Sequence, residues 1–340
     1  MVTLFGKMYS RRALSQRVGD LMQVAGVERF TYDEGVQKGV QAARVRSGGG
    51  LDFTVLFSRG MDISAASFFG IPFAWVSSTG WAHPHALVPE WRGWLQTFHG
   101  GLLTGCGLSN AGAANQDGEE ALGIHGRLSH LPAESASAWT DWEGDEATVF
   151  VEGTMREATV FGENLRLRRT ISAPVGNTSM TITDTITNEG FKTSPLMLLY
   201  HLNFGWPLVE EGTVLRLPEG TKTTPRDAAA QKGSATATTL TAPTPGYEEQ
   251  CFFHEMPGEE VVVELVNPSG FGVRIAYKKS EFPHLTQWKM MGEGEYVCGI
   301  EPANCRVLGR AAEREAGRLQ YIEPGETRRF SVTLTAFAPP

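Results

Sequence analysis

Helical periodicity, cysteine pairs and long apolar runs are all scarce in this 340-residue chain. Its four cysteines, Cys106, Cys251, Cys298 and Cys305, are widely spaced without a C-x-x-C motif, which favours buried thiols in a reducing compartment over disulfides or a zinc site. No run approaches 18 apolar residues, and the N-terminus lacks an apolar segment followed by a small-residue cleavage site. We therefore expect a cytoplasmic protein without a membrane partner.

The sequence also lacks basic clusters, because the net charge is −8 and Arg166–Arg169 alternates with apolar residues as on a solvated strand. This balance argues against a nucleic-acid partner. The zinc-protease, phosphate-loop, nucleophile-elbow and dinucleotide motifs are absent too. His83 and His85 have no downstream partner at metal-ligand spacing. We expect neither a cofactor nor a metal.

What the chain does contain is 39 glycines and short alternating segments bounded by turn residues, a pattern typical of an antiparallel β-sandwich. The clearest predicted strands are Ala147–Arg156, Leu165–Ser172, Met180–Asn188, Pro195–Phe204, Glu259–Asn267, Val273–Lys278, Tyr296–Ile300 and Arg328–Phe337. No linker divides the chain, so residues 1–340 are interpreted as one all-β domain.

Two segments depart from this strand pattern. Residues 11–27 carry Leu14, Val18, Leu21 and Met22 at helical spacing, which predicts one early helix capped by Ser10 or Ser15. Residues 218–246 are rich in Ala, Thr, Gly and Pro and show no core pattern. Such a stretch is a lid, a partner-contact loop or a mobile segment.

The apolar run Leu196–Leu208 reads as a strand buried on both faces, yet it carries His201 and Asn203 near its end. A buried polar group without a hydrogen bond costs about 1–3 kcal/mol, so these side chains must be bonded or face a cavity. His125, in LGIHGR, and Glu301, in CGIEPAN, also end apolar runs. Two imidazoles and a carboxylate would supply a general acid and a general base without metal. Three unrelated polar strand ends are the alternative.

Aromatic residues and glycines cluster in residues 71–116, including Trp75, Trp81, Trp91, Trp94 and Phe98. They would suit a stacking wall for the apolar face of a sugar, or core corners of a sandwich. His99 is followed by two glycines, which permit close approach of a ligand or a turn.

The stretches around His125, His201 and Glu301, together with the closing PGETRRFSVTLTAF, resemble the aldose 1-epimerase (galactose mutarotase) family, and more closely its uncharacterised mutarotase-like branch. In LYHLNF, Tyr200 replaces the family's asparagine before the histidine, and Asn203 follows instead. The resemblance implies a large antiparallel β-supersandwich and interconversion of the α and β anomers of a free sugar.

Ring opening of a hemiacetal needs one proton removed from the anomeric hydroxyl and one delivered to the ring oxygen. Reference pKa values of about 4.3 for glutamate and 6.5 for histidine suggest Glu301 as the base and His201 as the acid. His125 would bond the ring oxygen or an adjacent hydroxyl.

The resemblance also suggests substrate-binding residues. Arg59, in SRGMDI, would match the family's substrate-binding arginine, whereas the family's aspartate has no clear match and Asp227 is a poor candidate. Further expected lining residues are His99, Arg127, Asn203, Trp288 and Lys289. A cationic set of Arg59, Arg127 and Lys289 would fit an acidic or phosphorylated sugar.

Two other functions use the same residues. One is a keto-sugar or uronate isomerase or epimerase that moves a proton on carbon, and the other is a sugar-binding protein without catalysis. In each case the expected partner is a small-molecule sugar, and the chain is expected to be a monomer or a homodimer.

Overall fold

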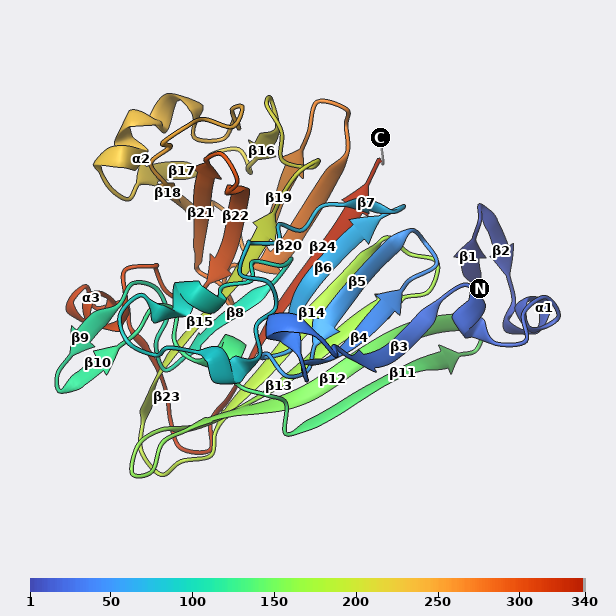
Figure 1. Cartoon of the computed structure of the whole chain (residues 1–340), viewed down its shortest axis with the longest axis horizontal. Coiled ribbons are helices and arrows are strands. Elements are labelled where there is room, and N and C mark those ends of the chain that lie inside the picture. The colour runs from blue at the N-terminus through green and yellow to red at the C-terminus, as the bar shows by residue number, and fades with distance from the viewer. Residues whose placement is uncertain (339–340) are drawn as a thin grey trace.

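The computed structural model describes residues 1–338, in which the strands form three large antiparallel sheets and two hairpins (Figure 1). The eight-stranded sheet has the order β11 (Ser135–Glu143), β12 (Glu146–Ala158), β13 (Asn164–Pro174), β14 (Ser179–Asn188), β24 (Thr327–Phe337), β20 (Gly272–Lys278), β19 (Glu260–Val266) and β16 (Val214–Arg216). The seven-stranded sheet has the order β17 (Lys222–Pro225), β18 (Gln250–Glu255), β21 (His284–Met291), β22 (Tyr296–Ala303), β15 (Ser194–Phe204) and β23 (Gln320–Ile322), with β8 (Thr104–Leu108) also paired to β15.

The remaining strands come from the N-terminal part of the chain. A five-stranded sheet comprises β3 (Gly26–Thr31), β4 (Gln41–Arg46), β5 (Leu51–Leu56), β6 (Asp62–Phe68) and β7 (Ile71–Pro72). The hairpins are β1 (Val2–Leu4) with β2 (Lys7–Tyr9), and β9 (Asn115–Asp117) with β10 (Glu120–Leu122). The helices are α1 (Arg11–Ser15), α2 (Ala228–Lys232) and α3 (Arg310–Glu315), with short 3-10 turns at Leu21–Gln23, Gly35–Gln37, Pro84–Ala86, Gly93–Thr97, Leu128–His130 and Ser234–Thr236.

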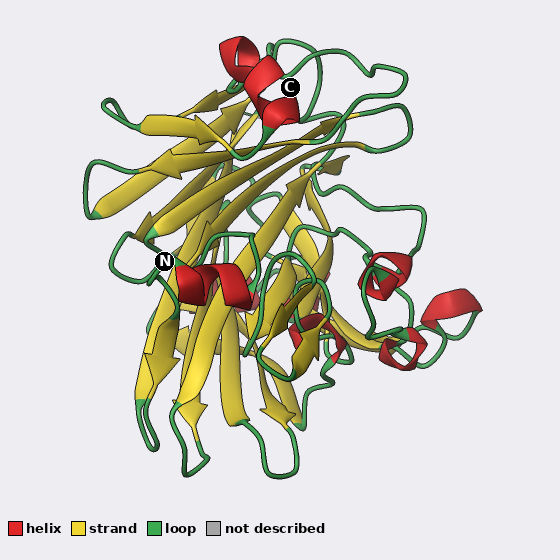
Figure 2. Ribbon diagram, turned by 90° about the vertical axis from the view of Figure 1, so that its left-hand side faces the viewer, coloured by secondary structure: helices red, strands yellow, loops and turns green. Residues whose placement is uncertain are grey.

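The sheets pack face to face, as the side view shows (Figure 2). Residues of β12, β13 and β14 alternate between buried and less buried positions, so each strand sends one face into the core. One apolar cluster contains side chains from Val2 to Ala336 and joins the five-stranded and eight-stranded sheets. The expectation of an all-β antiparallel sandwich is confirmed.

Strand β15 lies inside the seven-stranded sheet, paired with β22, β23 and β8. Every residue from Leu196 to Phe204 is buried, as the unbroken apolar run predicted. Its buried position brings the polar end of the strand, His201 and Asn203, into the interior of the protein.

The expected helix over residues 11–27 is wrong in its length, because α1 ends at Ser15. Ser10 does cap α1, accepting a hydrogen bond from the backbone N–H of Ala13. Gly19 then interrupts the helical segment, and the Asp20 side chain caps a separate 3-10 turn. Leu14, Val18 and Leu21 nevertheless pack against the core, so their spacing reflected burial rather than one continuous helix.

The irregular stretch 218–246 includes β17, α2 and the 3-10 turn Ser234–Thr236. Lys289 and Gln287 of β21 donate hydrogen bonds to backbone carbonyls at Thr236, Ala237 and Thr239, and these bonds hold the stretch against the sheet. No helix within residues 1–338 has the length and apolar character needed to cross a membrane.

Candidate active site

A cavity of about 400 Å³ opens beside the seven-stranded sheet and receives side chains from four of its neighbouring strands. In spatial order these are Cys251 of β18, Trp288 of β21, Glu301 of β22 and His201 of β15. The other lining residues are Trp91, Arg92, Trp94, Leu95, Phe98, Gly112, Ala113, Ala114, Ile124, His125, Arg226, Glu249 and Val307.

The three polar residues singled out in the sequence meet at this cavity, although none of them ends a strand: His201 lies within β15, Glu301 within β22 and His125 in a loop. His201 Nε2 lies 3.3 Å from Glu301 Oε1, and the imidazole rings of His125 and His201 lie 5.5 Å apart, edge to face. The pairing of β15 with β22 explains the first contact, because Leu202 lies opposite Ile300 and brings His201 beside Glu301. The arrangement can exchange a proton between an imidazole and a carboxyl group.

Asn203 stands behind His201 and does not line the cavity, which corrects its expected role as a lining residue. Its side-chain oxygen lies 2.6 Å from His201 Nδ1, and its Nδ2 donates to the main-chain oxygen of His201 at 2.8 Å. The outer nitrogen of the ring, Nε2, is left to face Glu301.

His125 is held in a tight loop whose backbone requires the following glycine. His125 and Gly126 both have positive φ, +56° and +71°, and a Cβ on Gly126 would lie 2.2 Å from the main-chain oxygen of Asn110. The backbone N–H of Gly112 donates to His125 Nδ1 at 3.3 Å. The His-Gly pair therefore reflects a close backbone approach that fixes the imidazole.

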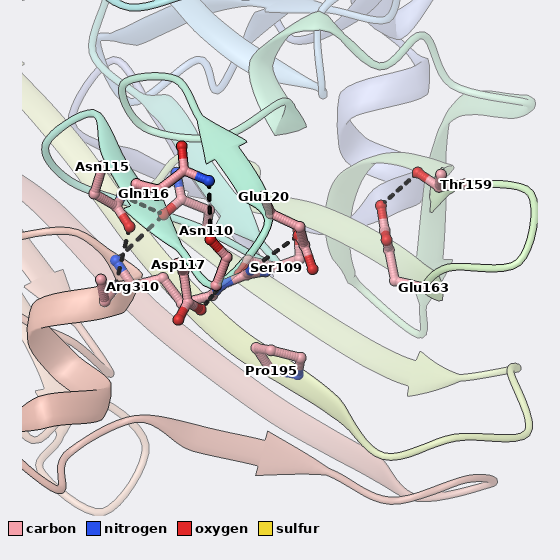
Figure 3. Close-up of polar contacts among 12 residues, drawn as sticks. Ser109, Asn110, Asn115, Gln116, Asp117, Glu120, Thr159, Glu163, Pro195 and Arg310 are labelled. Carbon is pink, nitrogen blue, oxygen red and sulfur yellow. Dashed lines mark hydrogen bonds and ion pairs between the residues drawn. The ribbon is translucent and has the colours of Figure 1, made fainter.

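The loop that carries His125 is braced by the polar network of Figure 3. Asn110 donates to the main-chain oxygen of Gly123, and its own oxygen accepts from Asn115 and from the backbone N–H of Arg310. Arg310 also forms ion pairs with Asp117 and Glu120 on the β9–β10 hairpin. These contacts tie the hairpin to α3 and so hold His125 at the cavity.

Aromatic rings surround the His201 imidazole. Phe98 lies 5.2 Å and Trp288 5.4 Å from it between ring centroids, and Trp94 stacks on Phe98 at 4.6 Å. Trp94 also contacts His125 at 4.8 Å, whereas Trp91 is 72% exposed at the rim. Of the five aromatic residues named in segment 71–116, three line the cavity, namely Trp91, Trp94 and Phe98. Trp81 instead packs against Tyr32 in a small apolar cluster.

Burial in this apolar surrounding shifts the protonation of all three groups. It raises the pKa of Glu301 to about 8, with the nearby Arg226 charge opposing and the Glu249 charge reinforcing the rise. It lowers the pKa of His201 to about 4, opposed by the bond to Asn203, and lowers the pKa of His125 to about 3, reinforced by His201. With a pKa near 8 the Glu301 carboxyl keeps its proton at neutral pH, whereas the reference value for glutamate would leave it ionised.

Arg59 lies outside the cavity, contrary to the substrate-binding role expected for it. Its guanidinium is fully buried and donates to the main-chain oxygens of Ser129, Ala82 and Thr97 and to the Ser129 hydroxyl. These bonds join separate loops, so Arg59 has a structural role.

Three more expected lining residues also have structural partners away from the cavity. His99 is buried against Asp62, and Lys289 uses its ammonium group on Thr236 and Thr239. Arg127 forms an ion pair with Glu163 and donates a hydrogen bond to the Thr159 hydroxyl. The cationic set expected to bind an acidic or phosphorylated sugar, Arg59, Arg127 and Lys289, therefore does not line the cavity, whereas Arg92 and Arg226 do.

Arg226 and Glu249 are cavity residues that the sequence did not indicate. Arg226 donates to Glu249 at 3.0 Å and to Asp227 at 2.7 Å, and Trp288 Nε1 donates to Glu249 at 3.1 Å. No motif surrounds either residue; only the pairing of β17 with β18 brings them to the cavity. Within residues 1–338 no cluster of three or more His, Cys, Asp or Glu could hold a metal ion.

Solved structures with a similar fold place these sheets in a known class. A "putative aldose 1-epimerase" from Klebsiella pneumoniae is 25% identical, with a TM-score of 0.86 over 91% of this chain and 83% of its own. A galactose mutarotase-like protein from Clostridium acetobutylicum is 13% identical, with a TM-score of 0.62 over 93% and 99% of the two chains. A galactose 1-epimerase from Lactobacillus acidophilus is 12% identical, with a TM-score of 0.60 over 92% of this chain and 99% of its own.

The protein therefore has the galactose mutarotase-like β-sandwich fold, with sugar epimerases among its structural relatives. A family model described as "Domain of unknown function (DUF4432)" matches residues 37–336, and the chain belongs to this family. Comparison with curated proteins gave no match.

Proposed function

We propose that this chain interconverts the α and β anomers of a free aldose or sugar derivative by acid–base ring opening. The observation that carries the proposal is the His201–Glu301 pair, 3.3 Å apart inside an aromatic-walled cavity that His125 also lines. The similar solved structures include a galactose 1-epimerase, which supports the same class of reaction.

Mutarotation conserves protons, and a pair that holds one proton is sufficient for it. In ring opening the bond between the anomeric carbon and the ring oxygen breaks. One member of the pair gives its proton to the ring oxygen while the other accepts the proton of the anomeric hydroxyl. After rotation about the bond between C1 and C2, ring closure on the other face reverses both transfers. The pair therefore ends as it began.

The raised pKa of Glu301 supports an order for the two proton transfers. Between about pH 4 and pH 8 the single proton resides on Glu301 rather than on His201. Opening then starts with the Glu301 carboxyl as acid and the neutral His201 as base, and the assignment expected from reference pKa values describes the closing half of the cycle. His125, whose Nδ1 accepts from Gly112, has its Nε2–H free to donate to a sugar oxygen.

The anomer exchange of freshly dissolved aldoses, uronic acids and deoxy sugars, followed by NMR saturation transfer, tests the proposal. We expect faster exchange for at least one sugar with the wild type and its loss in Glu301→Gln. Glu264→Gln is a control, because Glu264 lies on β19 and pairs with Arg274 away from the cavity. Sugar binding without faster exchange would favour a sugar-binding protein, and solvent deuterium appearing on a sugar carbon would favour a carbon epimerase; either result would contradict mutarotation.

A further inference from the structure

Asn203 lies on β15, the strand that carries His201, but its side chain does not line the cavity. It follows His201 by two residues on β15, so both side chains point to the same face of the strand. It is fully buried, and within residues 1–338 its side chain forms hydrogen bonds only with the ring and the main-chain oxygen of His201. The hydrogen bonds of the Asn203 side chain therefore act on His201 alone.

The two bonds of Asn203 fix the orientation of its amide. Because Nδ2 donates to the main-chain oxygen of His201, Oδ1 is the atom that faces the imidazole Nδ1 at 2.6 Å. A carbonyl oxygen accepts hydrogen bonds and cannot donate them, so the imidazole Nδ1 must carry a hydrogen. In the neutral ring, Nε2 then presents its lone pair to Glu301.

We propose that Asn203 is a positioning residue that keeps a hydrogen on Nδ1 of His201, so that Nε2 is the nitrogen that exchanges a proton with Glu301 or with the substrate. This inference rests on the proposed function, and hydrogen-bond geometry assigns the tautomer of the neutral ring. The neutral His125 ring has the opposite tautomer, because the Gly112 N–H donates to its Nδ1 and the hydrogen of the ring is therefore on Nε2.

The other ionisable groups near the pair do not compete for this proton. Cys106 of β8 and Cys251 of β18 remain thiols, because burial raises the pKa of each well above its usual value. Arg226 is paired with Asp227 and Glu249. Burial lowers the pKa of His125 and keeps that ring neutral. His201 therefore exchanges its proton with Glu301 or with the substrate.

Nitrogen-15 NMR of the histidine side chains tests the tautomer directly, without substrate, on the full-length protein. We expect the hydrogen on Nδ1 in wild-type His201, and its transfer to Nε2 in Asn203→Leu, because leucine offers no acceptor. Thr223→Val is the matched control, since it removes the Nδ1 partner of His254, a buried histidine outside the cavity. A hydrogen on Nε2 of wild-type His201, or an unchanged tautomer in Asn203→Leu, would overturn the inference.

Kinetics of anomer exchange provide the second readout. We expect kcat to fall about 100-fold in Asn203→Leu with little change in KM, because the base is presented in the wrong tautomer. Asn203→Asp should keep the hydrogen on Nδ1 and recover most of kcat, while its charge favours the imidazolium and moves the acidic limb of the pH profile upward. Wild-type kcat in Asn203→Leu, or an unmoved acidic limb in Asn203→Asp, would contradict the role. If the wild type exchanges no sugar, the proposed function fails while the NMR result still decides the tautomer.

Discussion

Two buried histidine–carboxylate pairs lie in this chain at nearly the same separation, and they differ in what surrounds the carboxylate. His99 Nε2 is 3.1 Å from Asp62 Oδ2, and His201 Nε2 is 3.3 Å from Glu301 Oε1. Only the second pair lines the cavity. Separation and burial alone therefore do not distinguish a structural pair from a reactive one.

The carboxylate of Asp62 is fully supplied with donors. It accepts hydrogen bonds from the Ser129 hydroxyl at 2.6 Å and from the backbone N–H of Gly105 at 2.8 Å, and Arg59 lies nearby. Burial alone would raise the pKa of Asp62, but the His99 contact, Arg59 and Ser129 together lower it. Asp62 is therefore a stable anion that joins loops.

Glu301 has no such support. Within residues 1–338 no hydroxyl or backbone N–H donates to it, and Arg226, whose charge opposes the rise of its pKa, is already paired with two carboxylates. Desolvation then dominates and raises the pKa of Glu301 to about 8. The comparison teaches that the number of donors around a buried carboxylate decides whether its proton is available at neutral pH.

The largest expected effect separates the two pairs by activity. Glu301→Gln should lower the rate of anomer exchange about 1,000-fold, because glutamine can neither give nor take the proton. Asp62→Asn should leave the rate per folded molecule within a few-fold of wild type. NMR saturation transfer on both variants checks this, and comparable losses of rate in the two would erase the proposed distinction.

The second effect separates the pairs by stability. Asp62→Asn should lower the free energy of unfolding by about 3 kcal/mol at pH 7, because it leaves buried Arg59 and the donors around position 62 without their anion. Glu301→Gln should cost little, since the wild-type carboxyl is already neutral at this pH. Urea unfolding followed by tryptophan fluorescence measures both, and a larger loss in Glu301→Gln would reverse the comparison.

The third effect is a pH dependence of the exchange rate, which we expect to follow the protonation of the His201–Glu301 pair and not that of the His99–Asp62 pair. Below about pH 4, His201 and Glu301 are both protonated and no base remains; above about pH 8, both are deprotonated and no acid remains. The exchange rate should therefore be flat between these limits and fall about tenfold per pH unit outside them. A profile of kcat/KM against pH checks this, and a single limb near pH 6.5 would indicate an ordinary exposed histidine instead.

The three site residues could be recognised in the sequence because a charge or imidazole inside an apolar run is conspicuous. Leu196–Leu208 predicted a strand buried on both faces, and His201, which lies within β15, lines the cavity. LGIHGR and CGIEPAN were informative for the same reason. Local sequence thus identified the three side chains that converge.

The surroundings of these side chains could not be predicted in this way, because they depend on contacts between distant segments. Arg59 was expected to bind substrate, yet its partners at Ala82, Thr97 and Ser129 come from loops up to 70 residues away. Lys289 was also expected to line the cavity, yet its ammonium group donates to the main-chain oxygens of Thr236 and Thr239, which lie about 50 residues earlier in the chain. Arg226 and Glu249 reach the cavity through strand pairing that no local pattern encodes.

The smallest expected effect tests how much the paired charges at the edge of the cavity tune Glu301. Removing the anion in Glu249→Gln should lower the pKa of Glu301, and removing the cation in Arg226→Gln should raise it, because the two charges act on Glu301 with opposite sign. Glu249 is 52% exposed, so solvent screens it and we expect shifts of the alkaline limb below about one pH unit.

The two shifts should have opposite direction and shrink as salt is added, and profiles of kcat/KM at low and high ionic strength measure both properties. The Asp62 pair offers the contrast, since its donors are buried and salt should leave its contribution to stability nearly unchanged. Shifts of the same sign in both variants would mean that Arg226 and Glu249 act by shaping the cavity around Trp288 rather than through their charges. In that case desolvation alone would account for the proton held by Glu301.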